Sequence, residues 1–311
     1  MRKIAVMGLW HVHAEEYYKS AVCAECEVVG AYDDDSERLN TFCEKYGVRA
    51  FDSFEELLAS DADGVTVGNA TCDHTETIIR IAEAGKDIFT EKILAFTVAD
   101  CLRVKEAVER NGVQFVIGLV HKSLSLPKTV KKVADSGELG KINYVRVRNC
   151  HDGSLGRWLP PHFYNKEQCG GGAMIDLGAH GMYLCSWILG MPDTYSSTFT
   201  ECCGDGVEDN AVTVMGYKNG AIALNETGFV SKYYPMTFEV CGEKGRVCMQ
   251  NGVVMKATTA TDGALVEVEK EEGDYMPIYQ FLYNDVKPGY GIDEAIELTE
   301  MMEKAYGNTA K

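Results

Sequence analysis

The sequence predicts two domains, an α/β domain with a doubly wound parallel sheet and then an α+β domain with a largely antiparallel sheet. In the first 120 residues, short β-rich runs alternate with segments of helical periodicity, as in successive βαβ units. Past Gly118 the strand candidates alternate apolar and polar residues, which suits a sheet with one covered face. A chain of 311 residues also exceeds the usual size of one domain.

We expect the first domain to span residues 1–120 and the second to span residues 121–311, with a C-terminal helix that could pack back on the first. Five strands are predicted in the first domain, at 3–8, 27–33, 64–68, 87–90 and 114–119. Apolar residues at helical spacing predict helices over 73–84 and 98–111. Gly85 and Gly112 stand where helix C-caps belong.

The second domain begins with a predicted helix over 126–136. Its strands are expected at 142–148, 211–217, 221–229, 237–241 and 247–249. Turn signals such as Asn219-Gly220 and Asn251-Gly252 separate them. A helix over 292–306 closes the chain.

Composition excludes several classes of protein. The chain has 30 Lys and Arg against 47 Asp and Glu, a net charge of −17, which repels nucleic acid and anionic membranes. No apolar run reaches the ~20 residues of a membrane span or resembles a signal peptide core. Twelve cysteines without an export signal indicate free thiols in the cytoplasm. The single CxxC from Cys23 to Cys26 lacks a second pair, so we expect no metal ion.

The turn after the first strand reads GLWHVH, and it follows the run Ile4 to Met7. Matched to the dinucleotide-binding pattern G-x-G-x-x-G, Gly8 takes the first position, Trp10 the second and His13 the third. The second strand ends at Asp33, where a carboxylate should bind the ribose hydroxyls. Two further aspartates would repel a 2′-phosphate, so NAD is favoured over NADP. The alternative is an Asp run that merely begins a helix at Ser36.

Four stretches resemble the family of glucose–fructose oxidoreductase and inositol dehydrogenase, often called Gfo/Idh/MocA. They are NATCDHTETIIRIAEAGKDIFTEKI, SGELGKINYVRVRN, GGGAMIDLGAHGMYLCSWILG and DNAVTVMGYKNGAIALNETGFV. The resemblance covers almost the whole chain and implies an N-terminal Rossmann domain followed by an open, mainly antiparallel sheet. It also implies that the substrate lies against the nicotinamide, that NAD is the cofactor, and that the chain forms a homodimer or tetramer.

Carried over residue by residue, the resemblance places the catalytic Lys, Asp and His of the family on Lys92, Asp176 and His180. The cofactor contacts that we expect are Gly8, Trp10, His11, His13, Asp33, Asn69, Thr71, His74, Glu91 and Lys92. The resemblance also places His121 after a sixth strand of the Rossmann sheet. Three positions depart from the family pattern, namely Trp10, Ile93 in place of a proline that commonly follows a cis bond, and Tyr183 in place of an aspartate.

The residue types suit removal of a hydride from an alcohol. A histidine can accept the hydroxyl proton near neutral pH, which is the role we expect for His180. Asp176 lies four residues earlier on the same helical face and could orient the imidazole or bind a second hydroxyl. Lys92 could stabilise negative charge on the reacting oxygen. The alternatives are a satisfied core histidine and a plain solvated lysine.

Substrate recognition is expected from the polar and aromatic segment 151–168, because loops of this kind often bind ligands. The candidates are Arg157, Trp158, His162 and Tyr164, together with His121. Such side chains also pack in ordinary loops.

These features favour an NAD-dependent dehydrogenase that oxidises a secondary alcohol of a sugar, glycoside or cyclitol, or reduces the matching ketone. A second hypothesis is a glycoside-cleaving enzyme that oxidises one ring carbon, eliminates the glycosidic bond and recycles its NAD in place. In that hypothesis His11 and His13 could serve proton transfer or a metal ion. A third is a dinucleotide-sensing protein without catalysis. The sequence identifies neither the substrate nor the direction of reaction.

Overall fold

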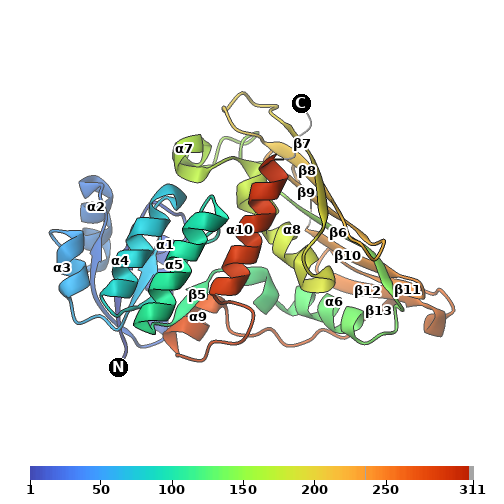
Figure 1. Ribbon diagram of the computed structural model, residues 1–311, viewed down its shortest axis with the longest axis horizontal. Helices are drawn as coiled ribbons and strands as arrows, with labels where there is room; N and C mark the ends of the chain where they lie inside the picture. Colours follow the sequence, from blue (N-terminus) through green and yellow to red (C-terminus); the bar gives the residue numbers. More distant parts are fainter. Residues whose placement is uncertain (235, 308–311) are drawn as a thin grey trace. The chain divides into compact units, whose positions relative to one another are not determined.

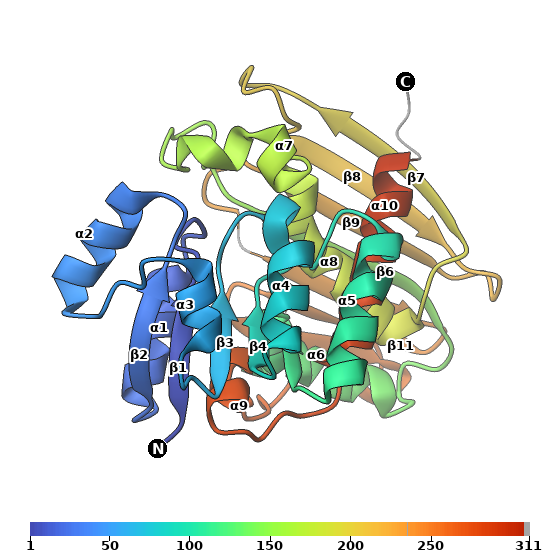
Figure 2. The ribbon, with the colours of Figure 1, turned by 60° about the vertical axis from the view of Figure 1, so that its left-hand side comes forward.

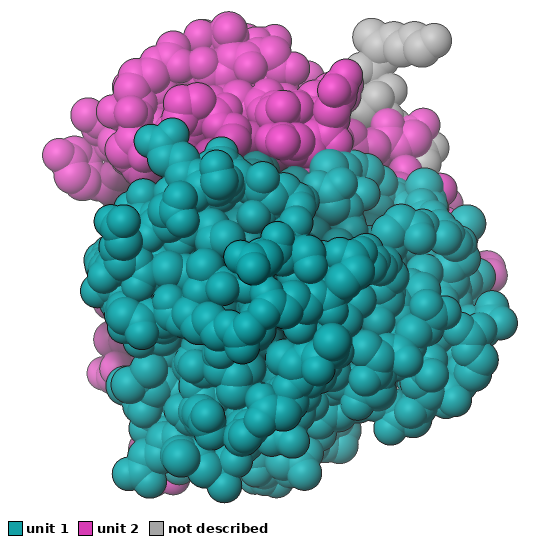
Figure 3. Space-filling model, turned by 90° about the vertical axis from the view of Figure 1, so that its left-hand side faces the viewer, with its two compact units in different colours: residues 1–118, 275–299 teal, residues 119–274, 300–311 magenta. Residues whose placement is uncertain are grey.

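The computed structural model describes residues 1–234 and 236–307 (Figure 1). These residues form two compact units, which Figure 3 colours separately. The first unit contains residues 1–118 and 275–299, and the second contains the described residues of 119–274 and 300–307. Among the described residues, no helix is long and apolar enough to cross a membrane.

The first unit is built on a parallel sheet of five strands in the order β2-β1-β3-β4-β5. The strands are β1 (Lys3–Met7), β2 (Glu27–Tyr32), β3 (Gly64–Val67), β4 (Asp87–Thr90) and β5 (Phe115–Ile117). All five were expected, and each boundary lies within two residues of its predicted position. The doubly wound parallel sheet is therefore confirmed.

The expectation of a sixth strand before His121 was wrong, because this sheet has five and His121 follows β5. Residues 275–299 return to the first unit late in the sequence, and they lie where a sixth strand was expected to pair. At the edge of the sheet, the backbone N–H of Ile117 donates to the carbonyl of Tyr290 at 2.9 Å. The returning segment thus takes a hydrogen bond that a further strand would otherwise use.

Helices flank this sheet, and α4 packs beside α5 (Figure 2). They are α1 (Ala14–Cys23), α2 (Ser36–Tyr46), α3 (Phe54–Ala59), α4 (His74–Glu83), α5 (Val98–Asn111) and α9 (Pro277–Leu282). Gly112 ends α5 in the left-handed conformation, as its position predicts. The late helix α9 brings Phe281 into the core, where its ring lies 5.9 Å from that of Phe89.

The second unit is built on a sheet of eight strands in the order β13-β12-β11-β10-β6-β9-β8-β7. The β6–β9 pair is parallel and the other neighbouring pairs are antiparallel. The strands are β6 (Ile142–Cys150), β7 (Thr194–Thr200), β8 (Asn210–Gly216), β9 (Ile222–Gly228), β10 (Thr237–Gly242), β11 (Gly245–Gln250), β12 (Val253–Thr258) and β13 (Val266–Glu267). The mainly antiparallel sheet is confirmed.

Helices α6 (Ser125–Asp135) and α8 (Ala173–Leu189) pack on this sheet, while the short helix α7 (Lys166–Cys169) precedes α8. The last helix, α10 (Ile292–Gly307), begins in the first unit and ends in the second. Side chains of β6 alternate between a buried set, such as Val145 and Val147, and a partly exposed set. On strands β8 and β9, Val214 and Ile222 are 39% and 44% exposed.

Close packing of α8 on β9 fixes the position of the helix that holds Asp176 and His180. The amide of Asn225 on β9 donates to the carbonyl of Gly178 at 2.7 Å. A Cβ atom at Gly181 would lie 1.9 Å from the side-chain oxygen of Asn225, so this position requires glycine. The two glycines therefore allow the helix to approach the sheet more closely than larger residues would.

Candidate functional site

The turn that follows β1 requires a glycine at position 8. Gly8 has a φ of +82°, and a Cβ atom there would lie 2.3 Å from the backbone nitrogen of Asn69. Its own N–H donates to the carbonyl of Tyr32 on the neighbouring strand at 2.8 Å. The turn is thus held against the ends of both β2 and β3.

The other two fingerprint positions accept side chains. Trp10 is 8% exposed, so its ring is buried in the protein. His13 has φ −87° and ψ −4°, a right-handed conformation that needs no glycine. The N–H of His11 donates to the carbonyl of Gly68 at 2.8 Å. Of the three glycine positions in the pattern, this turn therefore requires glycine only at Gly8. The other two positions hold Trp10 and His13.

Asp33, which directly follows β2, is buried and accepts three hydrogen bonds. The donors are the N–H of Leu9 at 2.6 Å, the N–H of Asp35 at 2.7 Å and the guanidinium of Arg38 at 2.7 Å. The carboxylate is thus tied to the turn after β1. Arg38 was not among the residues expected from the sequence, since it is one of several charged residues on α2.

Asn69 and Thr71 lie between β3 and α4, and His74 is the first residue of α4. The Asn69 side chain donates to Thr77 at 3.0 Å, while its oxygen is buried without a hydrogen-bond partner among the described residues. Thr71 begins a short 3₁₀ turn, Thr71–Asp73. His74 is fully buried between carbonyl oxygens, with Nε2 3.2 Å from Asn69 and Nδ1 3.1 Å from Ile93, and burial lowers its pKa.

Glu91 and Lys92 directly follow β4, and the peptide bond between Lys92 and Ile93 is cis. One oxygen of Glu91 accepts the N–H of Lys92 at 3.1 Å, and the other lies 2.8 Å from Nδ1 of His13. Burial would raise the pKa of Glu91, but His11, His13 and Lys92 together lower it to about 2. Glu91 is therefore a buried, charged carboxylate between two imidazoles.

In the second unit, His180 projects from α8 and is buried. Its Nδ1 lies 2.8 Å from the hydroxyl of Tyr183, which also accepts the backbone N–H of His121 at 3.1 Å. The rings of His121 and His180 are 4.6 Å apart and nearly perpendicular. The structure thus brings together His121 and His180, which the sequence separates by 59 positions, and Tyr183 joins them.

Asp176 lies one helical turn before His180 and is half-buried. It is close enough to His151 to affect that ring, since burial lowers the pKa of His151 while Asp176 and Asp152 raise it. His151 directly follows β6 and begins the segment 151–168 from which substrate recognition was expected, but it was not singled out as a site residue. Its position at the end of a strand was the signal that would have identified it.

The loop after β6 holds the other predicted substrate residues. Trp158 is 54% exposed, its ring lies 4.6 Å from that of His151, and its indole N–H donates to Asp152 at 3.0 Å. Arg157 forms an ion pair with Asp205. The hydroxyl of Tyr164 accepts a hydrogen bond from Ser154 at 3.1 Å.

The ring of His162 lies 5.2 Å from that of Phe163, in the 3₁₀ turn Pro161–Tyr164. The five candidate substrate residues therefore come from two segments of the second unit, His121 before α6 and the others in the loop between β6 and α8.

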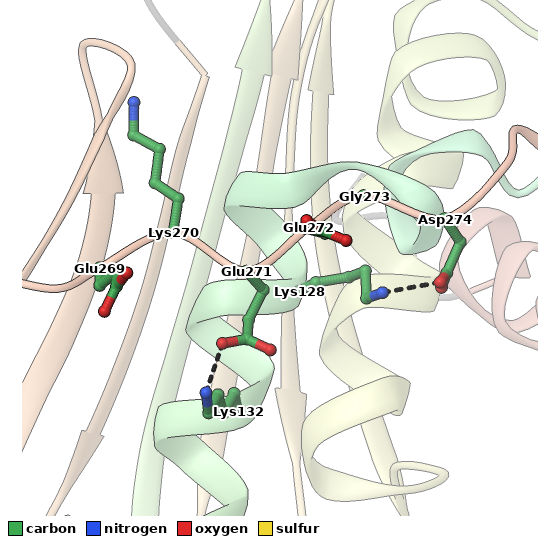
Figure 4. A pocket seen from close by; sticks show the side chains of 8 residues that line it. All are labelled: Lys128, Lys132, Glu269, Lys270, Glu271, Glu272, Gly273 and Asp274. Atoms are coloured by element: carbon green, nitrogen blue, oxygen red, sulfur yellow. Dashed lines mark hydrogen bonds and ion pairs between the residues drawn. The ribbon is translucent and has the colours of Figure 1, made fainter.

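A polar groove of about 590 Å³ lies elsewhere in the second unit (Figure 4). Its lining includes none of the predicted site residues. Lys128 pairs with Asp274 at 2.8 Å, and Lys132 pairs with Glu271. The lining also includes Glu269, Lys270 and Glu272, so charges of both signs surround the groove and neither sign dominates.

The first unit has the features of a dinucleotide-binding domain. The glycine turn after β1, Asp33 after β2 and the buried oxygen of Asn69 after β3 all lie at the carboxyl edge of the parallel sheet, where such folds bind ligands. These residues fit NAD. Together with the second sheet domain they define an NAD-binding oxidoreductase.

Comparison with family models agrees with the assignment as an NAD-binding oxidoreductase. Residues 2–119 match the oxidoreductase family with an NAD-binding Rossmann fold, and residues 128–248 match the GFO/IDH/MocA C-terminal domain. The chain belongs to the Gfo/Idh/MocA family, it is an NAD-dependent oxidoreductase, and the resemblance seen in its sequence is confirmed.

Curated relatives and solved structures are similar along most of the chain. A myo-inositol 2-dehydrogenase of Thermotoga maritima is 26% identical over 90% of this chain and 82% of its own length. A D-glucoside 3-dehydrogenase of Escherichia coli is 25% identical over 78% and 75%. The structure of GenD2 from gentamicin A biosynthesis in complex with NAD has a TM-score of 0.82, at 22% identity, over 99% of this chain and 93% of that one.

Proposed function

We propose that the chain is a dehydrogenase that oxidises a secondary alcohol of a sugar, glycoside or cyclitol with NAD, or reduces the matching ketone. The observation that supports this most strongly is the pairing of His180 with the Tyr183 hydroxyl at 2.8 Å, one turn after Asp176 on α8. A base for the alcohol proton is the residue that this reaction requires. The relatives named as inositol and glucoside dehydrogenases support the substrate class.

In this proposal the cofactor is held at the carboxyl edge of the parallel sheet. Asp33 would bind the ribose hydroxyls, and the turn from Gly8 through Trp10 and His11 to His13 would contact the pyrophosphate. Asn69, Thr71, Glu91 and Lys92 come from the adjacent strand ends. His74 would act indirectly, because its ring is enclosed by carbonyl groups and holds the two loops together. When bound, NAD supplies the acceptor for the hydride.

His180 would accept the hydroxyl proton at Nε2. Tyr183 can receive a hydrogen bond from Nδ1–H, which leaves the lone pair on Nε2 for the substrate. Asp176 would bind a second hydroxyl or favour the imidazolium through its charge. Lys92 would donate to the reacting oxygen, so that negative charge developing there is stabilised.

Substrate binding would involve the loop after β6. Trp158 presents a largely exposed ring, and an aromatic face of this kind can stack on the apolar face of a sugar. His121, His162 and Tyr164 would supply polar contacts. Arg157 already pairs with Asp205, so it would meet an anionic substrate group only by exchanging that partner. We also expect a cytoplasmic homodimer or tetramer, in which the partly exposed sheet face forms the subunit contact.

The test is a panel of sugars, glycosides and cyclitols in which release of NADH is followed by absorbance. A substrate should give steady NADH formation, and His180→Ala should lower kcat/KM by about 10²–10⁴ while NAD affinity is unchanged. Ser186→Ala, on the same helix, is the matched control and should keep full activity. Full turnover by His180→Ala would refute the mechanism. Cleavage of a glycoside without net NADH would instead support the elimination reaction.

A further inference from the structure

We propose that His11, His13 and Glu91 form a binding site for a divalent transition-metal ion, next to Lys92. The three side chains lie in the first unit, on the loops that follow β1 and β4. The proposal goes beyond the dehydrogenase assignment and does not depend on it, because the ion would bind to the protein without any substrate.

The distances suit a common ion. One ligand atom from each residue lies within 4.8 Å of the others. Nδ1 of His13 is 2.8 Å from Oε1 of Glu91, and Nδ1 of His11 is 3.7 Å from the same oxygen. With bonds of about 2.0–2.2 Å to a zinc ion, neighbouring ligand atoms are roughly 3.0–3.5 Å apart. The observed separations of 2.8 Å and 3.7 Å lie on either side of this range, so small side-chain rotations would bring the ligand atoms into it. The 2.8 Å contact is a hydrogen bond from Nδ1 of His13 to the carboxylate, so binding of an ion there releases this proton to solvent.

The Glu91 carboxylate is oriented by a hydrogen bond to one of its two oxygens, as metal-binding carboxylates usually are. Its Oε2 accepts the backbone N–H of Lys92 at 3.1 Å, which leaves Oε1 directed at both imidazoles. Hydrogen bonds of this kind orient ligands and are a regular feature of metal sites. The side chain of Glu91 is 3% exposed, whereas that of His13 is 42% exposed, so an ion could reach the group from the solvent side of His13.

His11 can join the site by exchanging one hydrogen bond. Its Nδ1 accepts the backbone N–H of His13 at 3.2 Å and lies 3.7 Å from an oxygen of Glu91. An imidazole nitrogen has one lone pair, so an ion bound at Nδ1 takes the place of the His13 N–H. The negative charge of the Glu91 carboxylate favours a cation at this point.

The donor set selects the class of ion. Two imidazoles with one carboxylate suit zinc, cobalt, manganese or iron, whereas magnesium and calcium prefer oxygen ligands throughout. Three protein ligands leave at least one coordination position for water or a hydroxyl oxygen, as in catalytic zinc sites. The set contains a single negative charge and Lys92 is adjacent, which will limit the affinity.

The test uses the purified chain with cobalt(II), whose visible absorption reports nitrogen and oxygen ligands, and with zinc in equilibrium dialysis. We expect about one ion per chain in the wild type. His13→Gly, which restores the glycine of the dinucleotide pattern, should weaken binding at least tenfold, since even loss of a residue that only supports a ligand costs about 10–100-fold. His11→Gln should weaken it similarly.

Cys23→Ser combined with Cys26→Ser is the matched control, because this CxxC pair offers other ligands in the same unit. Binding should persist unchanged in that variant. Circular dichroism and urea unfolding of His13→Gly show whether the domain is still folded. Glu91→Gln removes the charge of the third ligand and should also weaken binding. Wild-type affinity in both His13→Gly and His11→Gln, loss of binding in the cysteine variant, or no binding by the wild type would overturn the proposal.

Discussion

The hydroxyl of Tyr183 lies 2.8 Å from Nδ1 of His180, one helical turn along the same helix. The same oxygen accepts the backbone N–H of His121 at 3.1 Å. Tyr183 therefore connects the segment before α6 to the imidazole that we propose as the base. The family resemblance leads us to expect an aspartate at this position, whereas the chain has the neutral hydroxyl of Tyr183.

Tyr183→Phe should lower kcat about tenfold and leave KM for NAD unchanged. A hydrogen bond that orients the imidazole is worth roughly 1 kcal/mol, which corresponds to a factor of about five to ten. In a His180→Ala background the same substitution should have little further effect, because the residue acts through the histidine. Additive losses in the double variant would contradict this role. The measurement is steady-state kinetics of the four proteins in the cycle.

Asp33→Ser should shift cofactor use toward NADP. Removing the carboxylate takes away the nearer of two ion partners of Arg38, since Asp33 lies at 2.7 Å and Asp35 at 3.3 Å. The guanidinium N–H groups released from Asp33 can bind a 2′-phosphate. The ratio of kcat/KM for NADP to that for NAD should rise by about tenfold or more. Asp34→Ser removes a neighbouring exposed carboxylate that contacts Tyr32, and it should change the ratio much less. Equal ratios in both variants would contradict the role of Asp33.

Gly8→Ala should destabilise the protein more than Gly85→Ala does. Both glycines have positive φ, at +82° and +69°, so each substitution carries a backbone penalty of about 1–2 kcal/mol. At Gly8 the new Cβ would also collide with Asn69, whereas nothing lies within 4 Å at Gly85. We expect an additional loss of about 1–3 kcal/mol at Gly8, together with weaker NAD binding. Urea unfolding of the two variants measures the difference, and equal losses would refute it.

The wild-type protein should lose stability on acidification through His74. Burial lowers the pKa of this ring, so below pH of about 6.5 the unfolded chain binds a proton that the folded chain does not. The free energy of unfolding should therefore fall by up to about 1.4 kcal/mol per pH unit below that point. His74→Asn cannot titrate and should show a smaller decrease between about pH 6.5 and 5. Identical slopes for the two proteins would exclude His74 as the cause.

Much of this fold could be predicted from local sequence signals. The buried parallel strands are short apolar runs, and α5 has the predicted bounds because Thr97 and Gly112 cap it at the two ends. The D-x-x-x-H spacing put Asp176 and His180 on one helix. Strands β7, β12 and β13 were not predicted. The residues of β7 are largely polar and β13 has two residues, so both depend on pairing with partners elsewhere in the chain. Strand β12, VVMKAT, has an apolar run after the Asn251-Gly252 turn that could have identified it.

The candidate site was less predictable because its contacts join distant residues. His13 and Glu91 are separated by 78 positions, and they meet because β1 and β4 end at the same edge of the sheet. The contact of Tyr183 with His121 spans 62 positions. The pairing of Arg38 with Asp33 depends on how α2 follows β2, for which a charged helix surface gives no specific signal.

The path of the chain through Phe281 and Tyr290 affects how the nucleotide domain can form during synthesis. Phe281 is buried beneath Gly64 and Phe89, and its carbonyl accepts a hydrogen bond from Arg2 at 2.8 Å. A nascent chain of residues 1–118 therefore lacks Phe281, the side chain that fills this part of the core. The first unit is completed only after residues 275–299 have been translated.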